Sequence, residues 1–123
     1  MISIHPSDAL TLPVDELALL VLADIKATSE WNSYNYTLHY QQDRTSGYSQ
    51  NPSAVQAIAE AVDWLRAHGM LAAKPGDNSG QGIFVTRRGT TALTQSAAAI
   101  RSINRLQEIF LRPFGCALHW HGI

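Results

Sequence analysis

The chain has 123 residues, of which 46% are hydrophobic and 15% charged, and its formal net charge at pH 7 is −1. This length fits a single domain, and the apolar content excludes disorder throughout because a buried core can offset the ordering entropy. No apolar run approaches the roughly 18–20 residues that cross a bilayer. The one cysteine, Cys116, excludes an internal disulfide, so we expect a reducing, cytoplasmic setting.

Charge is distributed unevenly along the chain. Residues 1–63 contain two Lys or Arg against eight Asp or Glu, whereas residues 64–123 contain seven against two. This split fits an acidic partner for the C-terminal half, or self-complementary packing, or chance combined with the preference of charges for helix ends.

The first predicted helix follows an N-terminal arm, residues 1–12, and runs from Pro13 to Thr28. Proline is tolerated in a first helical turn, and Asp15 and Glu16 suit the positive end of the helix dipole. Apolar residues then recur at helical spacing: Leu17, Leu20, Val21 and Ile25.

Residues 30–50 permit two interpretations. Alternation of Tyr34, Tyr36, Leu38 and Tyr40 with polar residues favours a strand over residues 34–40. Ser33 as an N-cap, with Tyr34, Leu38 and Gln41 on one face, favours a helix from Tyr34 to Gln42, which we prefer. Core packing is the expected role of the aromatic side chains in this segment, and base stacking is the alternative; they are Trp31, Tyr34, Tyr36, Tyr40 and Tyr48.

A third helix is predicted from Ser53 to His68. Ser53 and Gln56 have the spacing of a capping box, and Gly69 is a stop signal. The apolar face of this helix contains Val55, Ile58, Val62 and Leu65.

Two β-prone runs, residues 70–73 and 83–86, enclose a segment rich in turn residues and predict a hairpin. Thr86 or Thr90 then caps a last helix, which we expect from Thr90 to Leu111, before a tail of residues 112–123. The expected core consists of Leu17, Leu20, Val21, Ile25, Ile58, Val62, Leu65, Leu71, Phe84 and Leu93.

This order of helix, helix, helix, hairpin, helix resembles a winged-helix domain, which we place at residues 13–111. The resemblance is specific over residues 60–89. The stretch Ala59–Leu71 is similar to a third helix entering its strand, and Ile83–Gly89 is similar to a strand with a Thr-x-x-Gly turn. The chain also resembles winged-helix modules that stand at the start of some uncharacterised bacterial proteins. The fold class expected is mostly α with a small hairpin and an extended C-terminal helix.

The resemblance implies duplex DNA as one possible partner. Lys74, Arg87 and Arg88 would contact phosphates through the wing, Arg101 and Arg105 would extend this strip, and Gln56 would read bases. However, Glu60 and Asp63 share the solvent face of the third helix with Gln56 and would repel phosphates.

We therefore favour a non-enzymatic module for protein interaction or self-association, with a homodimer or a partner protein as the expected complex. A helix from Thr90 to Leu111 would span about 33 Å, more than its own core needs. Its distal part and the tail carry apolar residues that would form an interface: Ile100, Ile103, Leu106, Phe110, Phe114 and Trp120.

Other kinds of site have little support. The chain contains neither a phosphate-binding Gly-rich loop ending in Lys-Ser/Thr nor a Gly-x-Ser-x-Gly elbow. Cys116, His119 and His121 lie close together in the tail, but a structural zinc site needs four ligands, usually in two pairs. We expect no catalytic site, no bound metal, no cofactor and no small-molecule substrate.

Overall fold

The structure, a computed structural model, describes residues 2–95 of the chain. Its elements are α1 (Pro6–Thr11), α2 (Val14–Thr28), α3 (Ser33–Gln41), the short 3-10 helix η1 (Tyr48–Gln50), α4 (Pro52–Ala67), β1 (Leu71–Ala73), β2 (Ile83–Val85) and α5 (Arg87–Leu93). The fold is thus mostly α with one small antiparallel hairpin, which confirms the coarse prediction.

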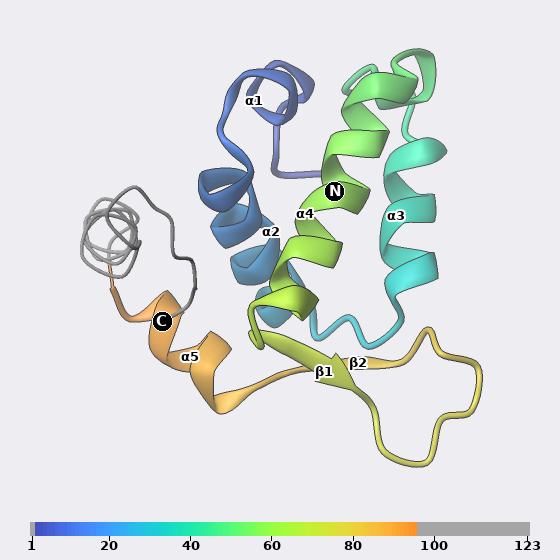
Figure 1. The fold of residues 1–123 in the computed structure, drawn as a ribbon. Coiled ribbons are helices and arrows are strands. Elements are labelled where there is room, and N and C mark those ends of the chain that lie inside the picture. Colours follow the sequence, from blue (N-terminus) through green and yellow to red (C-terminus); the bar gives the residue numbers. More distant parts are fainter. Residues whose placement is uncertain (1, 96–123) are drawn as a thin grey trace, which may run out of the picture.

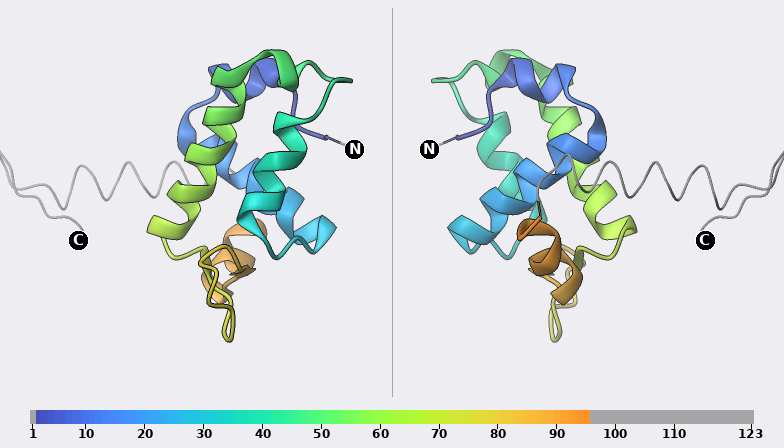
Figure 2. Two further views of the ribbon diagram at one scale, coloured as in Figure 1. Left: turned by 90° about the vertical axis from the view of Figure 1, so that its right-hand side faces the viewer. Right: turned by 90° about the vertical axis from the view of Figure 1, so that its left-hand side faces the viewer.

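The helices α2, α3 and α4 pack together, with the hairpin at one end of them (Figure 1). The loop between β1 and β2 projects away from the helices, and Figure 2 shows it as the tip of the molecule at that end. Short α1 packs against α4. The segment expected as an N-terminal arm therefore contributes to the fold: Ile4 and Ala9 are buried, and the Tyr48 hydroxyl donates to the Ile4 carbonyl at 2.7 Å.

Asparagine begins two of the helices where serine was predicted. The Asn32 side chain accepts a hydrogen bond from the Asn35 amide and starts α3, and the Asn51 side chain accepts one from the Ala54 amide and starts α4. Asparagine is at least as good an N-cap as serine, and Pro52 at the first position of α4 leaves Ser53 inside the first turn. The predicted caps at Ser33 and Ser53, and the strand considered for residues 34–40, are therefore wrong.

The buried core contains most of the predicted residues, with two corrections. Leu20 is exposed because α2 buries Leu17, Ala18, Val21, Leu22 and Ile25 and turns Leu20 outward. Phe84 is exposed because neighbouring strand residues face opposite ways, and β2 buries Ile83. Leu93 is only partly buried, packed against the edge of the core.

The predicted pairing of the hairpin is confirmed, with Leu71 opposite Val85 and Ala73 opposite Ile83. Thr86 caps α5, since its hydroxyl accepts from the Gly89 amide at 3.0 Å and donates to the Gly69 carbonyl at 2.6 Å. The helix begins at Arg87 and ends at Leu93, followed by a turn at residues 94–95. The predicted start at Thr90 is therefore three residues late, and the helix does not include residues 94–95. The rest of the helix predicted to end at Leu111 lies outside the described residues.

Gly89 allows α5 to pack closely on the hairpin. A Cβ at this position would lie 2.5 Å from the Met70 carbonyl oxygen and 3.0 Å from a Val85 methyl carbon. We predict that Gly89→Ala lowers the free energy of unfolding by about 1–3 kcal/mol, measured by urea denaturation, because backbone must move to admit the methyl group. Thr90→Ala, at the next and exposed position, is the matched control and should change stability little. Equal stability of the two variants would contradict the close packing.

Candidate interaction surface

Large aromatic side chains are exposed at the hairpin end of the molecule. Trp31 retains 49% of its accessible surface and Phe84 43%. The Lys74 ammonium lies 4.2 Å from the centre of the Trp31 ring, a cation–π distance. We call Trp31, Lys74 and Phe84 the hairpin face.

Backbone pairing places Trp31 beside the hairpin. The segment between α2 and α3 runs antiparallel to residues 81–83, with Asn32 opposite Gly82. The Ser33 amide donates to the Gln81 carbonyl at 2.8 Å, and the Ile83 amide donates to the Trp31 carbonyl at 2.7 Å. This segment therefore acts as a short third strand on the free edge of β2.

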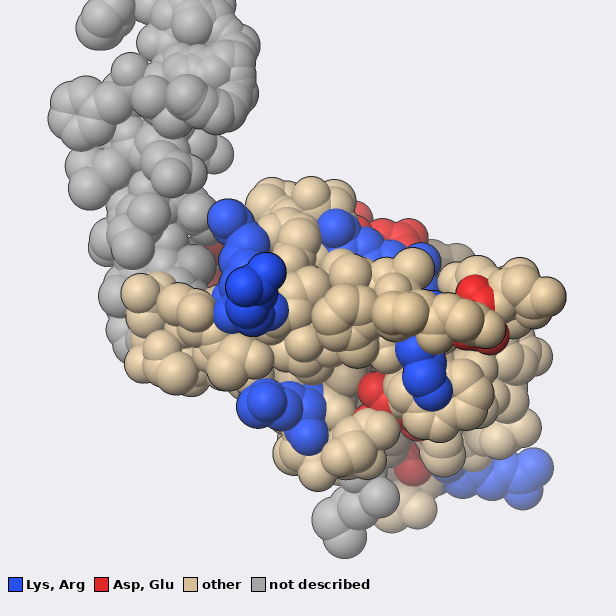
Figure 3. All heavy atoms as spheres, turned by 90° about the horizontal axis from the view of Figure 1, so that it is seen from below, with Lys and Arg blue, Asp and Glu red and all other residues tan. Residues whose placement is uncertain are grey.

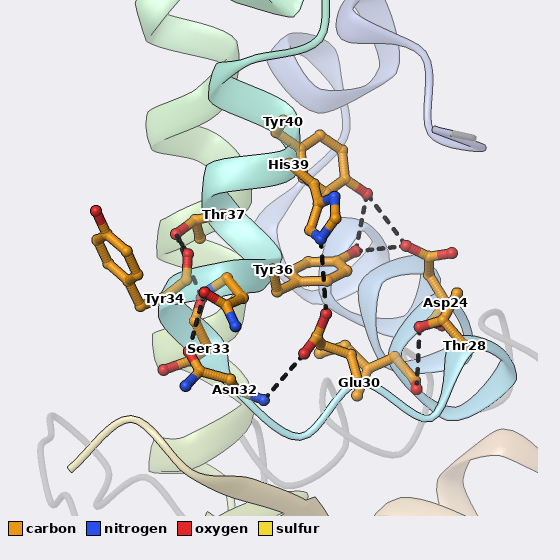
Figure 4. A network of polar contacts seen from close by, with 12 residues as sticks. Asp24, Thr28, Glu30, Asn32, Ser33, Tyr34, Tyr36, Thr37, His39 and Tyr40 are labelled. Atoms are coloured by element: carbon orange, nitrogen blue, oxygen red, sulfur yellow. Dashed lines mark hydrogen bonds and ion pairs between the residues drawn. The ribbon is translucent and has the colours of Figure 1, made fainter. Parts of the chain in front are cut away.

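Polar contacts fix the turn into α3 (Figure 4). The Glu30 carboxylate accepts from the Asn32 amide at 3.2 Å and lies 4.0 Å from Nε2 of His39. The Asn32 side chain in turn caps α3 through the Asn35 amide at 2.9 Å. The Glu30 and Asn32 side chains thus fix the turn into α3 by accepting hydrogen bonds from the Asn32 and Asn35 amides.

Two buried tyrosines attach α3 to α2. The Tyr36 hydroxyl donates to Asp24 at 2.8 Å, and the Tyr40 hydroxyl lies 2.8 Å from that of Tyr36 and 3.3 Å from Asp24 (Figure 4). Burial raises the pKa of both phenols well above the ordinary value, and burial likewise raises the pKa of Tyr48 to about 12. A pocket of about 210 Å³ adjoins these side chains. Because the Tyr36 and Tyr40 hydroxyls already bind Asp24 and each other, we assign these three side chains a structural role.

The expected core role holds for only some of the aromatic segment. Tyr36, Tyr40 and Tyr48 are buried, whereas Trp31 and Tyr34 are exposed. The set predicted to share one face of α3, Tyr34, Leu38 and Gln41, is not the buried one. The buried face contains Tyr36 and Tyr40, which are four residues apart. That spacing was visible in the sequence, but the strand pairing that exposes Trp31 had no local signal.

The structure brings only some of the residues predicted to contact nucleic acid to one surface. Lys74, Arg87 and Arg88 are exposed, and basic side chains are spread over the underside of the molecule, where the hairpin and α5 lie (Figure 3). Within residues 2–95, none of these three forms a salt bridge. Gln56 is exposed on α4, away from the hairpin, and Arg101 and Arg105 lie outside the described residues.

The outer face of α4 is acidic, as the sequence predicts. Glu60 and Asp63 are both exposed and follow Gln56 along the helix, and neither forms a salt bridge in the described part of the chain. A phosphate backbone approaching Gln56 would meet these carboxylates. This arrangement opposes the use of α4 as a helix that enters a DNA groove.

The loop between the strands is shaped by Asp77. Its carboxylate accepts from the Ser79 hydroxyl at 2.8 Å and from the Gly82 amide at 2.7 Å. These hydrogen bonds, with that to Ser79 the largest contribution, hold the pKa of the Asp77 carboxyl below its usual range. A Cβ at Gly82 would lie 2.5 Å from the same carboxylate, so a larger residue there would displace the Asp77 side chain.

Other predicted sites lie partly outside the structure. The interface residues Ile100, Ile103, Leu106, Phe110, Phe114 and Trp120, and the tail residues Cys116, His119 and His121, are not among the described residues. Among residues 2–95, no group of three or more His, Cys, Asp or Glu side chains is placed to hold a metal ion. Nor does any helix in this range have the length and apolarity to span a membrane.

Comparison of the chain with protein-family models, curated proteins and solved structures gives no match.

The buried tyrosines predict a loss of stability at alkaline pH. Their pKa values are raised in the folded protein, whereas an unfolded chain releases phenol protons near pH 10. The unfolded state therefore binds fewer protons above about pH 10, and the free energy of unfolding falls as the pH rises further. Phenolate absorbance from these tyrosines should rise together with loss of the helical circular-dichroism signal. Complete ionisation near pH 10 with the helices intact would contradict their burial.

Proposed function

We propose that this chain is a winged-helix module that acts by binding another protein or a second copy of itself and that carries no active site. The order of elements supports this assignment, with α2, α3 and α4 followed by the β1–β2 hairpin and then α5. In a winged-helix assignment the β1–β2 hairpin is the wing, and residues 31–33 attach it to the helices.

The observation that carries the proposal is the hairpin face. Trp31 and Phe84 are aromatic, about half exposed and situated on hydrogen-bonded stretches of backbone, so they present apolar area on a fixed support. Aromatic residues supply much of the binding energy at protein interfaces. Lys74 adds a positive charge beside Trp31, which favours an acidic partner surface.

The apolar residues predicted for the C-terminal interface remain part of this proposal. They include Ile103 and Phe110, which the structure does not describe. A complex could therefore use the hairpin face, the C-terminal segment, or both.

Duplex DNA is the second candidate partner, favoured by the exposed side chains of Lys74, Arg87 and Arg88, none of which forms a salt bridge within residues 2–95. In this alternative the chain would be a transcriptional regulator or a targeting domain, using the wing and α5. The acidic outer face of α4 counts against it, because phosphate contacts supply most of the affinity for DNA.

The main proposal predicts that complex formation depends on Trp31. At micromolar concentration, the chain alone or mixed with extract of its source cells should sediment faster than a monomer. Trp31→Ala should weaken this complex about tenfold or more, as removal of an aromatic anchor does. Leu10→Ala is the matched control, since Leu10 on α1 is equally exposed, at 49%, but lies at the other end of the helices, and it should leave the complex intact.

A monomer under all these conditions, or equal weakening by both substitutions, would contradict the proposal. The same samples should be titrated with duplex DNA at low salt. Binding that Arg87→Gln with Arg88→Gln weakens for every sequence would favour the second candidate instead.

A further inference from the structure

A groove of about 290 Å³ opens between α3, α4 and the loop that joins β1 and β2. Its walls include Ser33 and Tyr34 from α3, Asp63 and Arg66 from α4, and Gln81 from the loop. The hairpin face does not include these residues, so the groove is a separate feature of the same end of the molecule.

Arg66 has unused hydrogen-bonding capacity in this groove. Its Nη2 donates only at 3.4 Å, to the Ser33 hydroxyl and to the Gly80 carbonyl. Its Nε is buried and has no hydrogen-bond partner among the described residues. No carboxylate in residues 2–95 forms a salt bridge with this guanidinium. A buried, unpaired donor on a charged group is costly, so a ligand that satisfied it would gain this free energy.

The shape of the free donors indicates which ligand group fits. The Nε and Nη2 protons of an arginine point in the same direction and form a fork that matches the two oxygens of a carboxylate. The contacts of Nη2 are long and correspondingly weak, so the guanidinium can turn toward a stronger acceptor. We propose that Arg66 in this groove binds a carboxylate of a partner polypeptide, either an acidic side chain or a chain terminus.

Asp63 and Glu60 favour a carboxylate over a phosphate backbone. Both are exposed on α4, and a nucleic-acid strand would bring a negative charge at every nucleotide along them. A ligand with one carboxylate and otherwise uncharged groups would be repelled at the groove by Asp63 alone, the one acidic residue among the described residues of its lining. Tyr34, 58% exposed on the same groove, offers an aromatic surface for the rest of the bound peptide.

This inference rests on the proposed function, because it names the chemistry of the partner. Ser33 connects the two features: its amide pairs with Gln81 next to the hairpin face, and its hydroxyl contacts both Arg66 and Gln81. A partner bound across residues 31–34 would therefore place an acidic group at Arg66 while its apolar surface covers Trp31.

The test follows the Nε–H signal of Arg66 by nuclear magnetic resonance during titration. Propionate serves as the side-chain probe, N-acetylglycine as the chain-terminus probe and propionamide as the uncharged control. We expect saturable shifts with one or both carboxylates and none with propionamide, and the tighter carboxylate identifies the source. No shift with either carboxylate, equal shifts with propionamide, or tighter binding of inorganic phosphate would overturn the assignment.

Substitutions separate the groove from the hairpin face. Asp63→Asn should tighten carboxylate binding about two- to five-fold by removing a like charge, whereas Glu60→Gln, on the same helix but outside the groove lining, should change it less. Arg66→Lys keeps the charge but removes the fork and its Nε–H signal, so binding is then followed at the backbone amides of Gly80 and Gln81, which line the groove. Carboxylate should no longer shift these amide signals in Arg66→Lys, while the helical circular-dichroism signal persists. Trp31→Ala should leave carboxylate binding unchanged, so failure of the proposed interaction would be distinguishable from failure of the groove.

Discussion

The pairing of residues 31–33 with residues 81–83 is the interaction on which the rest of this molecule depends. A hairpin with three residues in each strand is marginal alone, because two short strands cannot bury enough surface. Two backbone hydrogen bonds, from the Ser33 and Ile83 amides, join it to the segment between α2 and α3. The same bonds leave the Trp31 ring at the surface beside Lys74 and bring the loop toward Arg66, so both the hairpin face and the groove depend on them.

The tyrosines and the asparagine cap make that pairing possible by fixing α3. Tyr36 and Tyr40 bind Asp24 on α2, and their rings pack edge to face with centres 5.1 Å apart. Asn32 both caps α3 and lies opposite Gly82, so the start of the helix and the strand-like pairing share one residue. Movement of α3 on α2 would therefore displace the exposed aromatic residues as well.

The sequence was sufficient for features that depend on local chemistry. Regular apolar spacing, with the start and stop signals, predicted both ends of α2 and α4 to within one residue, and the two β-prone runs around turn residues predicted the hairpin. It was insufficient where tertiary contacts decide. Phe84 was expected inside, but only the pairing of β2 determines which side of the strand faces the helices. Trp31 was assigned to the core with its neighbours because the pairing with residues 81–83, about 50 positions away, has no local signal. The groove was not foreseen either, since Ser33, Arg66 and Gln81 come from three separate segments.

Amide hydrogen exchange at Ser33 and Ile83 tests the central claim most directly. If residues 31–33 form a strand on β2, both amides are engaged in hydrogen bonds and should exchange much more slowly than amides in an unstructured peptide. The account predicts protection at both positions under conditions that leave the helices folded. Fast exchange at both amides, with α2 and α4 still protected, would show that the hairpin is not joined to the helices in this way and would contradict the account of both surfaces.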